Sequence, residues 1–193
     1  MTFQELRAKI KTPIFSRNDV IKLFPDEPEN QINTQLHRIA ARGGLIGLKR
    51  GVYLFSDTKI DEFVIANRLY TPSYVSLESV LNTSGVIPDI TATVTSVTPI
   101  TSKKFNTPVG NFTYSKIARN LFFGYQSIID QQSGLYYEIA SPEKAFLDFI
   151  YIRRMRDLSE SRIDISGLDK SLLTNYLTYF PGWVRKVVEK CII

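Results

Sequence analysis

The chain has 193 residues, 44% of them hydrophobic, and its 24 basic and 19 acidic residues give a formal net charge of +5. That length allows one substantial core and a second, smaller one, so we expect one or two domains. The small positive charge is compatible with an anionic partner, and the single cysteine, Cys191, excludes an internal disulfide and a cysteine-based metal cluster.

The start of the chain does not resemble a secretory signal, because the first fifteen residues alternate polar and apolar side chains. No later segment approaches the roughly 20 consecutive apolar residues that cross a bilayer. A lone cysteine is typical of a reducing compartment. We therefore expect a soluble, cytoplasmic protein with no membrane partner.

The first strongly patterned element is a short helix after Ser16, a typical N-cap residue, with Asp19 as an acid in the first turn. Its apolar stripe is formed by Val20, Leu23 and Phe24. Pro25 ends this helix, and a second helix is expected over residues 28–42, where Gly43 and the next glycine end it. Two helices joined by a short turn predict a helix-turn-helix.

The second helix has two different faces when its residues are placed about 100° apart. Ile32, Leu36 and Ile39 fall on one face and should pack against the core. The opposite face carries Asn33, Thr34, His37, Arg38 and Ala41. Amides, hydroxyls and guanidinium groups can bond to base edges in a major groove. An ordinary solvated helix face would have the same composition, and the helix alone does not decide between the two.

Two short apolar runs follow, over residues 45–48 and 52–55, joined by Lys49 and Arg50, with Gly51 able to take a positive φ. A hairpin with a basic tip after such a helix is typical of a wing. No acidic residue occurs from position 30 to position 56, as expected for a surface that approaches phosphates. The segment therefore predicts DNA binding, with a winged helix used only for protein contacts as the alternative. The candidate DNA-binding residues are Asn33, Thr34, His37, Arg38, Arg42, Lys49 and Arg50.

The rest of the chain predicts a mixture of helices and strands. Helices are expected over 61–70 and 73–85, short antiparallel strands within 91–117 and a strand over 135–140, and helices over 141–154, 168–180 and 182–192. The fold class is therefore α+β. We expect an N-terminal winged helix-turn-helix domain (1–57) followed by a mixed α/β domain (58–193), with a small, largely antiparallel sheet and flanking helices.

Common catalytic patterns are missing from the sequence. His37 is the single histidine, so histidine-based nucleophilic triads and zinc hydrolase sites lack their components, and no glycine-rich phosphate loop occurs. Glu143 and Asp148, with Lys144 nearby, could hold Mg²⁺ in a nuclease, but on one helix they point about 140° apart. The alternative is a first-turn acid and a helix-surface acid. We predict no catalytic residue, no metal and no cofactor.

A second stretch without acids runs from position 90 to position 129 and interleaves basic residues with aromatic ones. Such a pattern can bind nucleic acid or an acidic protein. The alternative is that the aromatic side chains form the core face of strands and the lysines their solvent face. The candidate recognition residues are Lys103, Lys104, Lys116 and Arg119.

Residues 12–154 resemble the AbiEi antitoxins, the antitoxin half of the AbiE abortive-infection, type IV toxin–antitoxin systems. The similarity is carried by RGVYLF, PSYVSLESVLNTSGVIPD, LFFGY and IASPEKAFLDFIYIRR. The resemblance implies an N-terminal winged helix that binds inverted repeats in its own promoter, and a C-terminal domain that counteracts a nucleotidyltransferase-like toxin, directly or indirectly. The segment 157–193 has no matching counterpart.

The leading interpretation is a bacterial transcriptional autorepressor and antitoxin, part of an antiviral defence system and not an enzyme. The resemblance implies that Lys103, Lys104, Lys116 and Arg119 lie in the domain that serves toxin neutralisation. The alternative is a metal-dependent, nuclease-like enzyme that processes nucleic acid and is delivered to DNA by its winged helix. In that case Glu143 and Asp148 would lie near a metal.

Overall fold

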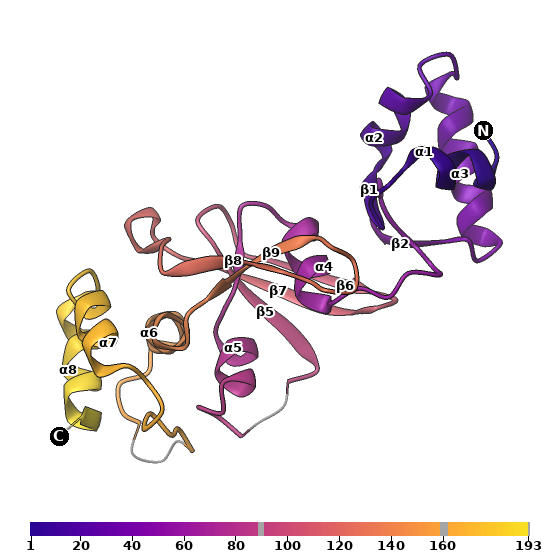
Figure 1. Ribbon diagram of the computed structural model, residues 1–193. Coiled ribbons are helices and arrows are strands. Elements are labelled where there is room, and N and C mark those ends of the chain that lie inside the picture. The colour runs from indigo at the N-terminus through magenta and orange to yellow at the C-terminus, as the bar shows by residue number, and fades with distance from the viewer. Residues whose placement is uncertain (89–90, 159–161, 193) are drawn as a thin grey trace.

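The computed structural model describes residues 1–88, 91–158 and 162–192 and has a mixed α+β fold (Figure 1). The first 55 residues form α1 (Phe3–Lys9), β1 (Ile14–Ser16), α2 (Arg17–Leu23), α3 (Glu29–Ala41), β2 (Leu45–Lys49) and β3 (Val52–Phe55). The chain continues with α4 (Glu62–Leu69), β4 (Tyr74–Val75), α5 (Glu78–Thr83), β5 (Thr93–Thr98), β6 (Lys103–Thr107), β7 (Gly110–Lys116), the 3₁₀ turn η1 (Arg119–Leu121), β8 (Tyr125–Ile129), β9 (Tyr136–Ala140), α6 (Pro142–Arg153), α7 (Lys170–Leu177) and α8 (Gly182–Ile192).

The N-terminal part places α1, α2 and α3 around a three-stranded antiparallel sheet of order β1-β3-β2. The helix expected after Ser16 is confirmed: the Ser16 backbone N–H donates to the Asp19 carboxylate at 2.7 Å, and the Asp19 N–H donates to the Ser16 hydroxyl at 3.2 Å. Of its expected apolar stripe, Val20 and Phe24 are buried, whereas Leu23 is exposed. This capping box satisfies two backbone donors at the start of α2. Gly51 has φ +74°, as the hairpin between β2 and β3 required.

The larger sheet has the order β6-β7-β5-β4-β9-β8. It is mixed: β5 pairs with β7 and β4 pairs with β9 in parallel, whereas the other pairs are antiparallel. Among the described residues, the expected antiparallel pairing is found in three of the five pairings of this sheet, and the other two are parallel. Alternation of polar and apolar side chains identifies a strand but does not determine which strand pairs with it. Here the β6–β7 hairpin places β7, and not β6, beside β5.

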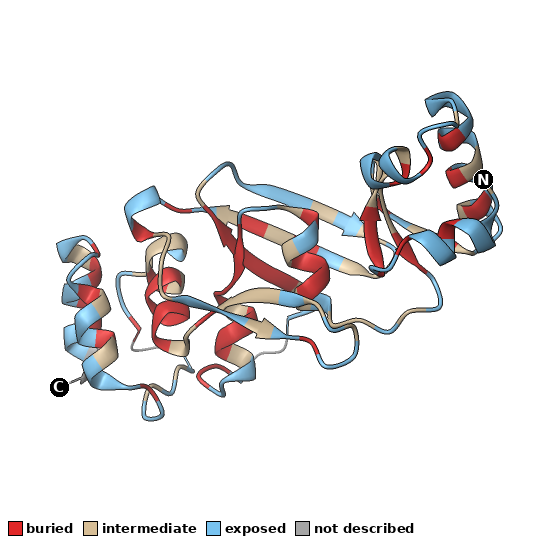
Figure 2. Cartoon of the chain, turned by 45° about the horizontal axis from the view of Figure 1, so that its top comes forward, coloured by how far each residue is buried: buried red, intermediate tan, exposed pale blue. Residues whose placement is uncertain are grey.

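Helices cover both faces of this sheet. Tyr114 on β7 points to α4, where its hydroxyl donates to the Ala66 carbonyl at 2.5 Å. Tyr74 on β4 points to the opposite face, where its hydroxyl donates to Asp148 on α6 at 2.8 Å. The helix α5 packs beside α6 on that face, and α7 and α8 pack on α6. Buried residues accordingly concentrate where the sheet meets these helices (Figure 2).

The helix expected over residues 73–85 is shorter than predicted. Tyr74 and Val75 form a strand in the middle of the sheet, and α5 begins only at Glu78. Ser73 lies just before this strand, and its hydroxyl donates to the Tyr70 carbonyl at 2.6 Å. An aromatic and a β-branched residue favour a strand, and burial between β5 and β9 decides the outcome.

The hydrophobic residues form two clusters that meet at the small sheet. Phe15 and Phe55 belong to the N-terminal cluster under α1, α2 and α3. Ile14, Leu48 and Leu54, from the same three strands, belong to the larger cluster of the following residues. Both faces of this sheet are therefore apolar, and its second face packs against the larger part of the chain. The two parts share an apolar interface.

Candidate functional site

The exposed face of α3 is the surface from which the candidate DNA-binding residues of this helix project. Ile32, Leu36 and Ile39 are buried, as the apolar stripe predicted. The polar face is exposed along three turns of the helix, which is the geometry that an element entering a groove of DNA requires. Its exposed residues are Asn33, Thr34, His37, Arg38, Ala41 and Arg42.

Arg17 borders this face on one side and connects three elements. Its Nε donates to the Asn33 side-chain oxygen, and its terminal nitrogen donates to the Glu29 carboxylate, both at 2.5 Å. Its backbone N–H donates to the Gly51 carbonyl at 2.8 Å. Arg17 thus ties the start of α2 to α3 and to the tip of the β2–β3 hairpin. It also neutralises Glu29, an acid at the edge of the candidate surface, a role that the sequence pattern did not reveal.

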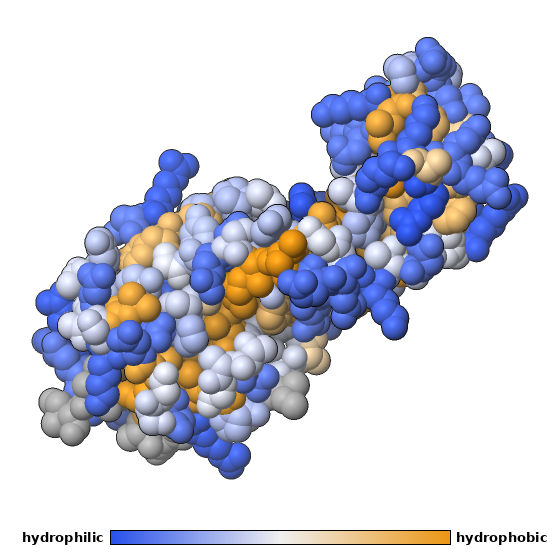
Figure 3. All heavy atoms as spheres, viewed as in Figure 1, coloured by the Kyte–Doolittle hydropathy of each residue, from blue (hydrophilic) through white to orange (hydrophobic). Residues whose placement is uncertain are grey.

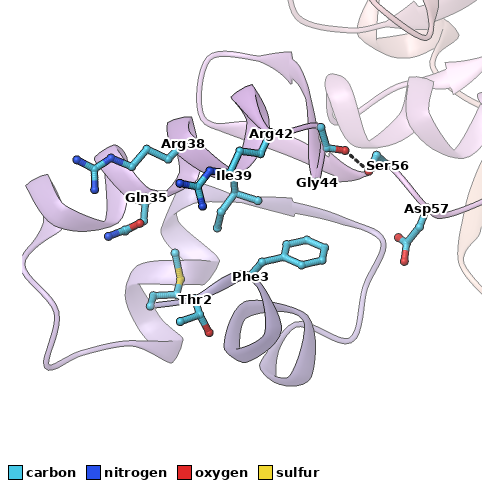
Figure 4. A pocket seen from close by; sticks show the side chains of 11 residues that line it. Thr2, Phe3, Gln35, Arg38, Ile39, Arg42, Gly44, Ser56 and Asp57 are labelled. Atoms are coloured by element: carbon cyan, nitrogen blue, oxygen red, sulfur yellow. Dashed lines mark hydrogen bonds between the residues drawn. The ribbon is translucent and has the colours of Figure 1, made fainter.

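A hollow of about 720 Å³ borders the same face on the other side (Figure 4). Arg38 and Arg42 extend from α3 along its rim, Phe3 and Ile39 form an apolar floor, and Asp57 lies at the far end. The N-terminal end of α1 completes the hollow. Sequence reasoning missed this helix, although Thr2 followed three residues later by glutamate is a capping-box signal.

The two basic residues at the hairpin tip differ in their surroundings. Arg50 is exposed, whereas the Lys49 ammonium donates to the Leu69 carbonyl and lies 5.4 Å from the centre of the Phe105 ring. Burial lowers the pKa of Lys49. The pairing register shifts between Gly47 and Lys49, and such a bulge changes the direction in which the following side chain points. The expected pair of basic tip residues is therefore divided: Lys49 faces β6, and Arg50 faces solvent.

A second hollow, of about 600 Å³, lies on the larger sheet beside α5. It extends over β5, β6 and β7, which α5 and α6 leave partly uncovered. At its border Arg153 donates twice to the Glu78 carboxylate, at 2.6 and 2.8 Å. Its lining residues are mostly hydroxyl-bearing or basic: Glu78, Thr91, Thr93, Thr95, Ser102, Lys103, Lys104, Thr113, Tyr114, Ser115 and Arg153.

The four candidate recognition residues of this region are all exposed but do not share one face. Lys104 pairs with Thr113 and therefore faces the hollow, whereas Lys103 pairs with Tyr114 on the opposite face. Lys116 lies two residues after Tyr114 and points the same way, and Arg119 lies in η1. The aromatic residues Phe112 and Tyr114 are buried, so they form the core face of β7. Residue 90, which begins the predicted stretch, lies outside the described residues.

The acids considered for a metal site are buried in α6. Asp148 and Lys144 are fully buried, and the Lys144 ammonium donates to the Asp148 carboxylate and to the Tyr74 hydroxyl. Ser76 donates to the same carboxylate at 3.0 Å. The expectation that Asp148 lies on the helix surface is therefore wrong, because α6 is covered by the sheet on one side and by α7 and α8 on another.

The surroundings of this ion pair shift the pKa values of both its members. Burial raises the pKa of Asp148 and lowers that of Lys144, and each of these effects is opposed by the charge of the partner. Burial, followed by the charge of Asp148, raises the pKa of the Tyr74 hydroxyl. Glu143 is also buried and accepts the Asp169 N–H at 3.0 Å. Within residues 1–88, 91–158 and 162–192, no three His, Cys, Asp or Glu side chains are grouped so that they could hold a metal ion.

No protein-family model and no curated protein matches this chain. Among the helices in the part of the chain that the structure describes, none has the length and apolar character needed to cross a membrane. On the face shown in Figure 3, hydrophilic side chains cover most of the N-terminal part, and hydrophobic ones gather over the middle of the larger part. The polar face of α3 and the hollow beside α5 bring candidate binding residues to the surface.

Proposed function

We propose that this chain is a bacterial DNA-binding transcriptional autorepressor and antitoxin without enzymatic activity. It would belong to a toxin–antitoxin, abortive-infection system and would counteract a nucleotidyltransferase-like toxin. The observation that carries the DNA-binding part of the proposal is the exposed polar face of α3, which the packing of α1 and α2 leaves free. The resemblance of residues 12–154 to the AbiEi antitoxins supports the antitoxin part.

Residues 1–57 act in this proposal as a winged helix-turn-helix domain. The order α2, turn, α3, followed by the β2–β3 hairpin, supports this assignment. In the proposed complex α3 enters the major groove, where Arg38 and His37 reach base edges. Arg50 at the hairpin tip contacts phosphate, and Arg17 holds α3 and the hairpin in one arrangement. Lys49 is engaged with Leu69 and contributes little to DNA binding.

Binding of this kind depends strongly on salt concentration. Each phosphate that the protein neutralises lowers the logarithm of the binding constant by about 0.9 per unit of log salt. Arg38, Arg42 and Arg50 are exposed and would make such contacts in the proposed complex. We therefore expect binding to the promoter to weaken as salt rises, with a log–log slope of roughly −3 from these three residues alone.

The experiment is a fluorescence-anisotropy titration with two duplexes, one covering the region upstream of the chain's own coding sequence and one with the same bases scrambled. Arg38→Ala should reduce discrimination between the duplexes by about 1–3 kcal/mol, because a base contact is lost. Arg50→Ala should weaken binding to both duplexes equally. Arg185→Ala, at an exposed arginine on α8, is the matched control. Equal losses on both duplexes for Arg38→Ala, or binding that does not change with salt, would contradict the proposal.

Residues 58–193 serve the antitoxin role in this proposal, and their exposed cations would carry it. Alanine substitution of Lys103, Lys104, Lys116 and Arg119 together should abolish protection of cells that express the cognate toxin. The alternative hypothesis of a metal-dependent, nuclease-like enzyme predicts instead that Glu143→Gln abolishes protection while the protein stays folded. Asp148 is a poor candidate for a metal ligand, because its carboxylate is already bound by Lys144, Tyr74 and Ser76.

A further inference from the structure

The hollow beside α5 combines side-chain hydroxyl groups with a lysine, Lys104, on one face of the larger sheet. Thr91, Thr95 and Ser102 are bound within the protein: Thr95 donates to the Ser76 carbonyl at 2.8 Å, Thr91 donates to the Thr93 carbonyl, and Ser102 accepts the Lys116 N–H. Among the described residues, the side-chain hydroxyls of three other lining residues have no protein partner. These are Thr93, Thr113 and Ser115.

Strand pairing places these groups in a row across the sheet. Lys104 on β6 pairs with Thr113 on β7, and Thr113 pairs with Thr95 on β5. Neighbouring strands lie about 4.8 Å apart, so the lysine and the two threonines follow one another at that spacing on the same face. Ser115 lies two residues further along β7 and faces the same way.

The charges of the hollow favour an anion. Lys104 faces the hollow, Lys103 points to the opposite face of the sheet, and the carboxylate that lines the hollow, that of Glu78, is paired with Arg153. Arg153 holds Glu78 through two hydrogen bonds, which neutralises this carboxylate. Free hydroxyl donors beside lysines are groups that proteins use to bind phosphate oxygens.

We propose that this hollow binds the phosphate backbone of a single nucleic-acid strand. A mononucleotide needs an apolar or aromatic surface for its one base, whereas a strand held by its phosphates can leave its bases in solvent. An acidic protein segment would need buried aromatic or arginine anchors. The hollow offers neither, because Tyr114 points to the opposite face and Arg153 is bound to Glu78. The β-strand β5 has six residues and is about 20 Å long, so the sheet surface is long enough to contact several phosphates of an extended chain.

This site is independent of the DNA-binding function proposed for α3, and the test keeps the two apart. The full-length protein carries Arg38→Ala and Arg42→Ala throughout, so that α3 no longer dominates nucleic-acid binding. The probe is a fluorescein-labelled twelve-nucleotide oligouridylate, followed by anisotropy. The promoter titration described above uses the unchanged α3 and a duplex, so either experiment can fail without the other.

In this background Lys104→Ala should weaken binding about tenfold and make the salt slope less negative by roughly 0.7, the value for one phosphate of a single strand. Thr113→Val removes a hydroxyl without changing shape or charge, and it should weaken binding several-fold. Lys186→Ala, at an exposed lysine on α8, should leave binding unchanged. Thr113→Val also keeps a β-branched side chain in β7, which protects the fold.

Three results would overturn the proposal. The first is equal loss of binding in Lys104→Ala and Lys186→Ala, which would mean that only overall charge matters. The second is unchanged binding in Thr113→Val. The third concerns two competitors, polyglutamate and inorganic pyrophosphate, compared with unlabelled oligouridylate at equal concentrations of negative charge. If polyglutamate displaces the probe as well as oligouridylate does, the occupant is an acidic protein surface. If pyrophosphate does so, the occupant is a free phosphate compound.

Discussion

The buried ion pair of α6 allows a stability prediction whose size can be worked out. Asp148→Asn keeps the shape of the side chain and can still accept from Tyr74 or Ser76, but it leaves the Lys144 ammonium buried without an opposite charge. Removing one member of such a pair costs about 3–5 kcal/mol. Lys144 can escape this cost by losing its proton, and at pH 7 deprotonation of an ordinary lysine costs about 5 kcal/mol, which sets the upper limit.

The pH dependence of the variant follows from the same reasoning. Without Asp148, burial lowers the pKa of Lys144 in the folded state and no carboxylate opposes it. A lysine with a lowered folded pKa binds fewer protons than in the unfolded chain, so stability rises with pH until the unfolded lysine also loses its proton. The deficit of Asp148→Asn should therefore shrink between pH 7 and pH 10, by at most about 1.4 kcal/mol per pH unit.

Urea denaturation followed by tryptophan fluorescence measures this directly, because Trp183 on α8 stacks on Tyr151 of α6 at 6.1 Å between ring centres. In thermal unfolding a loss of 3–5 kcal/mol should lower Tm by roughly 6–20 °C for a chain of this size. Glu189→Gln, at an exposed acid on α8, is the control. A loss below about 1 kcal/mol, or a deficit that does not change with pH, would refute the reasoning.

Three further predictions concern single positions. Gly124→Ala should be more destabilising than Gly134→Ala in urea denaturation: both glycines have positive φ, but only at Gly124 would a Cβ lie 2.9 Å from Lys144, so equal losses would contradict the steric argument. Asp130 has its pKa lowered, chiefly by the hydroxyl of a nearby serine, so its contribution to stability is complete above about pH 4 and is lost as the pH falls further; Asp130→Asn should unfold with a weaker dependence on acid, and an unchanged acid transition would argue against this. Lys49→Ala should reduce the free energy of unfolding by more than it reduces the free energy of promoter binding in the anisotropy assay, because the Lys49 ammonium donates to the Leu69 carbonyl. A larger loss of binding free energy would mean that Lys49 lies on the DNA-binding surface.

Local signals in the sequence predicted several elements closely. The helix expected over 141–154 is α6, with Ser141 as its cap, and the helix expected over 28–42 is α3, with its apolar stripe buried. Such elements are determined by residues within one or two turns of each other, so a single chain segment contains the whole signal. The same applies to the hairpin with Gly51 at its tip.

The basic residues of the candidate surfaces could also be predicted, but not which of them point in the same direction. Lys103 and Lys104 are adjacent in sequence and lie on opposite faces of β6, which follows from strand alternation once the strand is known. Lys49 and Arg50 are adjacent as well, and here the separation comes from a bulge in β2. The hydroxyl groups of the hollow were visible as threonines at positions 91, 93 and 95, but their meaning depended on which strands became neighbours.

The sequence by itself thus determined the helices with clear caps, the polar face of α3 and the basic stretches without acids, because each depends on residues close together in the chain. The tertiary structure decided the strand order, the burial of Lys144 and Asp148, and the apolar interface at the small sheet. These features depend on which distant segments come into contact. Burial is a property of that contact: a carboxylate four residues from a lysine on a helix is a surface pair in water, and it becomes a buried pair only when a sheet and two helices cover it.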